Sequence, residues 1–199
     1  MGRISDRFNL EKQVVFYMSY HDNKMNQYIH FMCIWPILIT AIVMLAGLDP
    51  LVEQPDIVKA LPFHEYMILN PAAIVALVYM VWYVCLDWMA GTLGAALVFA
   101  GYLFANYFNQ VSPATLGMPA WQPALAVHVT AWILQFIGHG VFERRKPALL
   151  DSLDQAVITA PMFVLLEALF PLGYRPQLYK RVMKQVKINV KNFHSSKTL

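Results

Sequence analysis

The sequence predicts an all-α fold: a polytopic membrane helical bundle with about four spanning helices, a short re-entrant or interfacial helix and amphipathic terminal helices. Of its 199 residues, 58% are hydrophobic and 14% are charged, whereas a soluble domain carries about 25% charged residues. Apolar runs of membrane length recur along the chain, and most cations lie outside them. The length suits a single membrane-embedded domain, residues 1–199. The net charge of +3 is small, so no nucleic-acid partner is expected.

Four apolar runs are long enough to cross a bilayer as helices, which takes roughly 20 residues each. They cover residues 31–48, 71–89, 92–109 and 122–142. We expect the second and third to be joined by a tight turn near Ala90 and Gly91. A fifth run, 156–172, is short for a crossing and contains Glu167, so it is predicted to be a re-entrant or interfacial helix.

The distribution of charge predicts how the chain is oriented. Cations gather in 3–24, at 144–146 and in 175–197, whereas the 49–70 loop carries four acidic residues and one lysine. Four crossings place every basic segment on the same side, which the positive-inside tendency makes cytosolic. Five crossings would separate the two basic ends, so we predict four spans with both termini cytosolic.

The two ends of the chain are predicted to lie at the membrane surface. Residues 1–30 are expected to form interfacial helices that precede the first span. Residues 174–199 form a basic tail in which valines and an isoleucine alternate with lysines. This spacing is typical of an amphipathic helix on an anionic membrane, although a solvated tail helix fits the pattern equally well.

Histidines inside a predicted span are the first candidates for chemistry. His64 and His194 lie in polar segments where nothing nearby converges on them. His128 and His139 lie in the fourth span, where ionisable side chains are costly and usually face a functional interior. On one α-helix they share a face with Gln135 between them, and Glu143 extends the same polar stripe.

The spacing of the two span histidines limits what they can do together. Eleven residues place His128 and His139 about 16 Å apart along an unbroken helix, too far to bind one ion. Either the helix opens at Gly138 or Gly140, or one histidine has another role, or there is more than one metal. His139 and Glu143 are four residues apart, a spacing that lets two side chains approach a common ion.

A second pair of histidines precedes the first span, in the segment YHDNKMNQYIH. His21 and His30 are nine residues apart and would point to opposite faces of one continuous helix. We expect a break at Asp22–Asn23, because short Asx side chains satisfy free amides at a helix start. The next helix is expected to begin near residue 24, with Asn26 one turn before His30.

This topology brings four polar side chains to the cytosolic interface: His21, His30, His139 and Glu143. Imidazoles with a carboxylate are the groups from which iron, zinc or copper sites are built. Oxygen chemistry at iron and hydrolysis at zinc both remain open from the residues alone.

Three segments of the chain resemble the 2-hydroxy fatty acid dioxygenase family, known from fungal phytosphingosine breakdown. They are FYMSYHDNKMNQYIH at 16–30, WILQFIGHGVFERRKPALLDSLDQA at 132–156 and APMFVLLEALFPLGY at 160–174. The middle of the chain, 49–120, matches only in hydrophobicity. The resemblance implies an endoplasmic-reticulum membrane protein of fatty acid α-oxidation and sphingolipid metabolism. Such a protein uses Fe²⁺ and O₂ to shorten a long-chain 2-hydroxy fatty acid by one carbon with release of CO₂.

The resemblance also implies a set of site residues. The family's metal-binding histidines map to His21, His30, His128 and His139. Glu143, Gln135 and Asn26 are then candidate catalytic residues that complete the metal's ligands, orient them or contact the substrate. The acyl chain is expected to lie among the membrane helices, with its head at the depth of the histidines.

Two alternatives belong to other functional classes. A non-catalytic membrane lipid-binding or scaffold protein would use the histidines as packed core groups and would purify without stoichiometric iron. A zinc-dependent lipid hydrolase would use Glu143 as a general base and would work without oxygen. The sequence predicts no oligomeric state.

Overall fold

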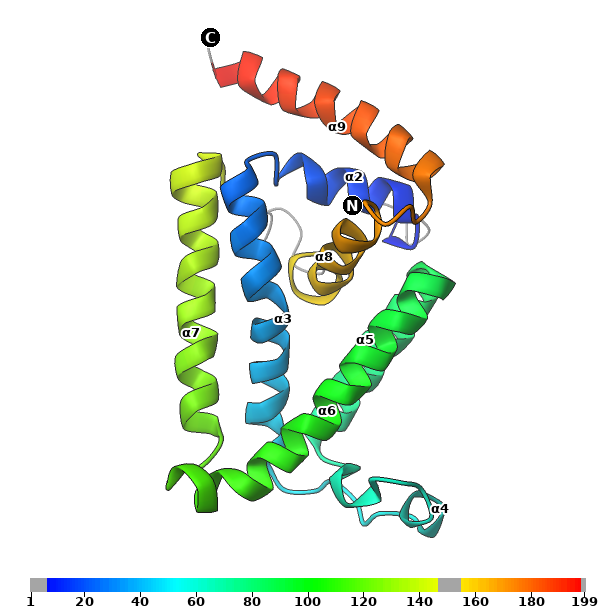
Figure 1. The fold of residues 1–199 in the computed structure, drawn as a ribbon, viewed down its shortest axis with the longest axis vertical. Helices are drawn as coiled ribbons and strands as arrows, with labels where there is room; N and C mark the ends of the chain where they lie inside the picture. The colour runs from blue at the N-terminus through cyan, green and yellow to red at the C-terminus, as the bar shows by residue number, and fades with distance from the viewer. Residues whose placement is uncertain (1–6, 147–154, 198–199) are drawn as a thin grey trace.

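The computed structural model describes residues 7–146 and 155–197, and every regular element within them is helical. The predicted all-α class is therefore confirmed for this part of the chain (Figure 1). Residues 1–6 of the expected interfacial segment, 147–154 of the family signature and 198–199 of the tail lie outside the described residues. The elements are α2 (Leu10–Ser19), α3 (Lys24–Ala46), α4 (Asp56–Lys59), η1 (His64–Tyr66), α5 (Pro71–Leu86), α6 (Trp88–Leu116), α7 (Trp121–Ile137), η2 (Gly138–Glu143), η4 (Gln155–Thr159), α8 (Ala160–Leu169) and α9 (Pro176–Lys197).

Three helical segments are long and apolar enough to cross a membrane, judged by length and composition alone. They are Lys24–Ala46, Trp88–Leu116 and Trp121–Glu143. The second predicted span, α5, is an apolar helix of 16 residues that packs along α6. The fifth run forms the short helix α8, which packs against α3 and α6. Four crossings, and a re-entrant path for α8, stay predictions.

The turn between α5 and α6 lies at Asp87, three to four residues earlier than expected. The Asp87 carboxylate accepts from the amides of Met89 and Ala90 at 3.1 and 3.0 Å and so begins α6. Ala90 and Gly91 are already helical. A Cβ at Gly91 would clash with the backbone of Tyr83, so this glycine permits the close approach of two helices instead of forming the turn.

The break between α2 and α3 is confirmed where the sequence predicts it. Helix α2 ends at Ser19, and α3 begins at Lys24 with Asn23 as its N-cap. The Asn23 side chain accepts from the amides of Met25 and Asn26 at 2.9 and 3.4 Å. An Asx side chain satisfies these amides because the first turn of a helix leaves them without carbonyl partners.

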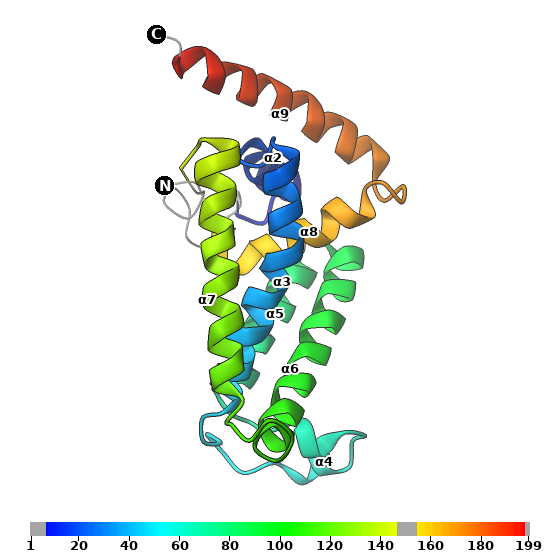
Figure 2. The same ribbon diagram turned by 60° about the vertical axis from the view of Figure 1, so that its left-hand side comes forward.

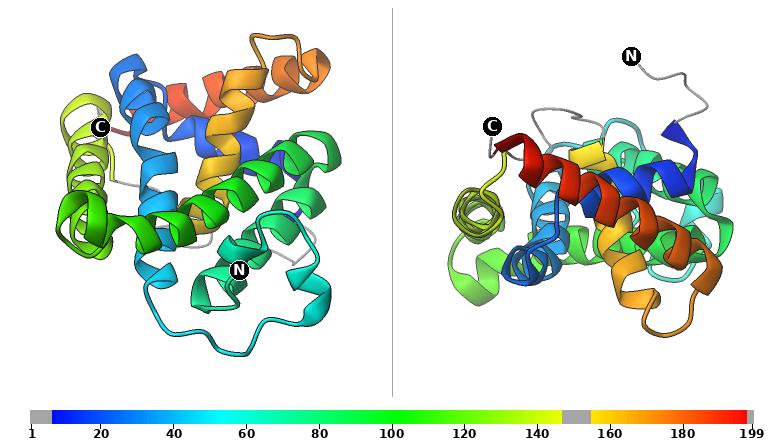
Figure 3. Two further views of the ribbon diagram at one scale, coloured as in Figure 1. Left: turned by 60° about the horizontal axis from the view of Figure 1, so that its bottom comes forward. Right: turned by 90° about the horizontal axis from the view of Figure 1, so that it is seen from above.

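Helices α3 and α7 stand side by side, and α2 and α9 lie across the end of the bundle at which α3 begins (Figures 1 and 2). The Asn26 side chain contacts Gly138, and the Thr40 hydroxyl is hydrogen-bonded to His128. The start of α3 therefore lies beside the end of α7, and the two helices are antiparallel. Figure 3 shows α9 passing over α2 when the molecule is seen from that end.

The basic tail is helical, and its apolar face lies against protein. Leu178, Val182 and Val186 of α9 are buried, and α9 packs on α2. Arg181 of α9 pairs with Glu11 of α2 at 2.9 Å. The apolar stripe that suggested a lipid-facing helix thus contributes to the core, and contact of the tail with a membrane stays a prediction.

Candidate metal centre

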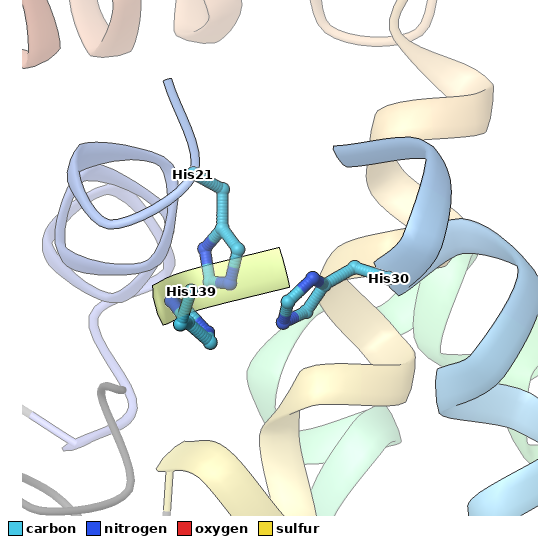
Figure 4. A group of neighbouring side chains, drawn as sticks. All are labelled: His21, His30 and His139. Carbon is cyan, nitrogen blue, oxygen red and sulfur yellow. The ribbon is translucent and has the colours of Figure 1, made fainter. Parts of the chain in front are cut away.

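Three histidines from three separate segments converge at one end of the bundle (Figure 4). His21 follows α2 in the turn, His30 lies in the second turn of α3, and His139 lies in η2. Each offers a ligand atom, and these atoms all lie within 4.8 Å of one another. The side chains are buried, with 3%, 3% and 4% of their surface exposed.

Two of the rings are oriented by backbone carbonyls. His21 Nδ1 donates to the carbonyl of Tyr17 at 2.6 Å, and His30 Nδ1 donates to the carbonyl of Asn26 at 2.9 Å. Because a carbonyl only accepts, the proton of each neutral ring sits on Nδ1, which leaves Nε2 bare. Such outer hydrogen bonds fix the tautomer and direction of metal-binding histidines.

The cluster leaves buried ring nitrogens unsatisfied. His21 Nε2 and His139 Nδ1 have no hydrogen-bond partner within residues 7–146 and 155–197. A buried polar atom without a partner costs free energy, so each such atom calls for a ligand. Three bare imidazole nitrogens around one point are a donor set that Zn²⁺, Fe²⁺ or Cu²⁺ accepts. The residues therefore fit a metal ion.

The electrostatics of His21 favour the neutral form that a metal needs. Burial lowers the pKa of His21 well below its ordinary value, and the neighbouring His30 and His139 lower it further. Arg145 acts in the same direction, and only the Tyr17 carbonyl opposes the shift. A histidine that is already neutral binds a metal without releasing a proton.

A π-helical segment places His139. Helix α7 changes to a π-helix over Gly138–Glu143, and π-bulges are frequent at functional sites. A Cβ at Gly138 would clash with the side-chain oxygen of Asn26, whereas one at Gly140 would meet nothing within 4 Å. The expected change in the helix thus begins at Gly138, where the missing side chain lets α7 approach α3.

His128 is not one of the three clustered histidines, and both of its ring nitrogens are occupied. Its Nδ1 lies 2.9 Å from the Thr40 hydroxyl on α3, and its Nε2 accepts from the indole of Trp132 at 3.0 Å. Among the described residues, the cluster that could hold a metal contains His21, His30 and His139 and not His128.

Glu143 holds the turn that carries His21. Its carboxylate accepts from the amides of Asp22 and Asn23, both at 3.0 Å, and from the Asn26 side chain at 3.1 Å. A carboxylate is favoured beside free amides at the start of a helix. Among the residues described, the cluster that could hold a metal contains the three histidines and not Glu143. Glu143 is placed to orient ligands through the turn.

The two remaining candidates lie beside the cluster in sequence and are fully enclosed. Asn26 is 0% exposed and Gln135 is 4% exposed. The Oδ1 atom of Asn26 and the Nε2 atom of Gln135 have no hydrogen-bond partner in the described part of the chain. Gln135 is one helical turn before the π-segment that holds His139.

Sequence reasoning missed two supports of the site. Arg145 donates to the Ser19 carbonyl at 2.6 Å and stacks over the ring of Tyr20 at 3.6 Å. Tyr17 stacks on His21 with ring centroids 4.1 Å apart, and its hydroxyl donates to Glu167 of α8 at 3.4 Å. Burial raises the pKa of Glu167 to about 7. A carboxylate inside an apolar run was the only sequence signal for this support.

The chain is similar in sequence to proteins of one known family. The family model described as 2-hydroxy-palmitic acid dioxygenase Mpo1-like matches residues 8–172. The chain is 28% identical over 185 residues to 2-hydroxy-palmitic acid dioxygenase MPO1 of Saccharomyces cerevisiae, covering 92% of this chain and 93% of that protein. No solved structure matches. The matched range contains all three clustered histidines and every helix that positions them, and the chain therefore belongs to the Mpo1-like family.

Proposed function

We propose that this protein is an Fe²⁺-dependent dioxygenase that converts long-chain 2-hydroxy fatty acids into fatty acids one carbon shorter. The observation that carries the proposal is the buried cluster of three histidines with unsatisfied ring nitrogens, at the end of helices apolar enough for a membrane. Membership of the Mpo1-like family supports this reaction class.

The proposed reaction balances with O₂ as the only other reactant. The bond between the carboxyl carbon and C2 breaks, and the carboxyl carbon leaves as CO₂. C2 is oxidised from an alcohol to a new carboxylic acid, and O₂ is reduced by four electrons to one oxygen atom of that acid and one of water. No external reductant is needed.

Fe²⁺ held by His21, His30 and His139 would supply a redox-active Lewis acid with positions left for the substrate and O₂. The Tyr17 and Asn26 carbonyls keep the rings of His21 and His30 turned inward. Burial of the cluster excludes bulk water from the reacting atoms.

Four further residues take supporting roles in this proposal. Glu143 and Asn26 position the histidine-bearing turn through their mutual hydrogen bond at 3.1 Å. The unpartnered amide of Gln135 donates a hydrogen bond to the head of the substrate. His128 ties α7 to α3 instead of binding iron, because both of its nitrogens are engaged.

The cellular setting follows from charge and resemblance. We place the protein in the endoplasmic-reticulum membrane with both termini cytosolic, since the basic segments then share the cytosolic side. The proposed substrates derive from fatty acid α-oxidation and the breakdown of phytosphingosine. A fatty acid keeps its tail in hydrocarbon and its head at the interface, so it can reach the histidines from the bilayer.

The test is to incubate the purified protein with Fe²⁺, O₂ and 2-hydroxypalmitate and to identify the product by mass spectrometry. We expect the fatty acid one carbon shorter from the wild type and from His64→Ala, which changes an exposed histidine, and none from His139→Ala. Product formed without oxygen would favour a zinc hydrolase. A protein that purifies without metal and makes no product would favour a scaffold.

A further inference from the structure

An apolar groove of about 340 Å³ runs between α3 and α7, the two helices that carry His30 and lead to His139. Its floor contains Cys33 of α3 and Ala131 of α7, which are 6% and 5% exposed. Its rim is formed by larger or more exposed side chains, among them Met32, Val127 and Leu134.

Small and irregular residues create this groove. Helix α7 presents Ala126, Thr130 and Ala131 along it, and α3 presents Pro36. Short side chains leave the hollow open, and a proline within α3 lacks the amide that would bond the carbonyl one turn earlier. The Thr40–His128 hydrogen bond ties α3 to α7, so the two walls are held together.

The groove leads toward the metal centre. Cys33 is three residues after His30, about one turn along α3. On α7, Ala131, Gln135 and His139 follow one another at steps of four residues, each roughly 6 Å along the axis. Along α7, Gln135 therefore lies between Ala131 of the groove floor and His139 of the cluster.

Gln135 carries a buried amide that has no partner in the described residues. Only 4% of the Gln135 surface is exposed, and its Nε2 has no hydrogen-bond partner in the described segments. A buried amide donor without an acceptor costs free energy. A ligand with an oxygen-rich head next to an apolar tail would satisfy the amide and fill the groove at the same time.

We propose that the α3–α7 groove binds the acyl chain of the 2-hydroxy fatty acid, which enters sideways from the bilayer, while the Gln135 amide donates to its carboxylate. This inference rests on the proposed function for the identity of the head group. The groove fits an amphiphile with a single alkyl chain, because its walls are largely apolar and the buried Gln135 amide lies one helical turn beyond Ala131 of its floor.

Two neighbouring residues of α7 give a matched test. Both Val129 and Thr130 are exposed on α7, but Thr130 lines the groove and Val129 does not. Thr130→Phe would project a ring into the path of the chain, and displacing reacting atoms by about 1 Å is enough to cost up to about 100-fold. We expect the ratio of kcat/KM for 2-hydroxypalmitate over 2-hydroxyoctanoate to fall at least about tenfold in Thr130→Phe. Val129→Phe should keep the wild-type ratio. Equal kcat/KM ratios in the two variants would refute the proposal that the acyl chain binds in this groove.

A second measurement does not depend on turnover. A 2-hydroxy fatty acid carrying a diazirine in mid-chain is photolysed with the full-length protein in vesicles, and the labelled peptides are mapped by mass spectrometry. We expect labels on the α3 and α7 segments that line the groove, reduced in Thr130→Phe and retained in Val129→Phe. Labels confined to α5 and α6 would refute the groove.

The two measurements separate the inference from the proposed function. If the wild type turns over neither acid but is labelled in the groove, the reaction is wrong and the groove stands. If the wild type is active but labelled elsewhere with an unchanged chain-length ratio, the groove is wrong and the reaction stands.

Discussion

The position of Glu143 predicts that its removal weakens metal binding without removing a ligand. Glu143→Ala deletes acceptors for two backbone amides and for the Asn26 side chain. The amides of Asp22 and Asn23 lie at the exposed start of α3, where losing a capping acceptor costs about 1 kcal/mol. The Asn26 amide is fully buried, so leaving it unpaired costs about 1–3 kcal/mol more. The free energy of unfolding should therefore fall by about 2–4 kcal/mol.

The effect on metal affinity follows from the turn that Glu143 holds. Loss of a partner that orients metal ligands typically weakens binding about 10–100-fold. Glu143→Gln keeps one acceptor oxygen, so its loss should be smaller than that of Glu143→Ala. Removing a ligand, as in His139→Ala, should abolish binding at the same metal concentration.

The assay is competition between the purified protein and a chelator of known Fe²⁺ affinity, with thermal unfolding in detergent measured in parallel. Glu53→Gln, which changes an exposed carboxylate in the 49–70 loop, is the control and should match the wild type in both measurements. If Glu143→Gln lost iron as completely as His139→Ala, Glu143 would be a ligand, and its proposed positioning role would be refuted.

Two further predictions concern residues around the cluster. His128→Ala should lower the free energy of unfolding by about 0.6–1.7 kcal/mol, the range for hydrogen bonds between membrane helices. Its metal content, measured by elemental analysis, should stay at the wild-type level. A loss of metal equal to that in His30→Ala would instead make His128 a ligand. Glu167→Gln should remove a pH dependence of stability. The folded-state pKa of Glu167 is raised to about 7 from 4.5, so its contribution is most favourable below the unfolded pKa and is lost as pH rises through 7. The variant should gain up to about 3 kcal/mol over the wild type at pH 8 and little at pH 4, measured by denaturant unfolding; an equal difference at both pH values would contradict the shift.

Local signals in the sequence correctly predicted the backbone of the N-terminal part of the site. Asx residues at 22–23 predicted the break that separates His21 from His30, and the structure confirms it, because Asn23 accepts from amides two and three residues further along its own helix. The α5–α6 turn shows the limit of such signals. A glycine marked it in sequence, but the Asp87 carboxylate begins α6 and Gly91 serves helix contact.

The second pair of histidines could not be resolved in the same way. Spacing along one helix showed that His128 and His139 are too far apart for one ion, and left three explanations open. Which histidine joins His21 and His30 depends on the register between α3 and α7. That register places Gly138 against Asn26 and His128 against Thr40.

The sequence by itself determined the all-helical class, the apolar segments, the helix break before the first span and the residues from which the site is drawn. These depend on composition, hydrophobic run length and local capping, which act over a few residues. Only the tertiary structure decided that His139 completes the cluster, that His128 bonds Thr40 and that Glu143 caps the turn. The physical reason is that these contacts join residues about 90 to 120 positions apart, and packing between helices sets them.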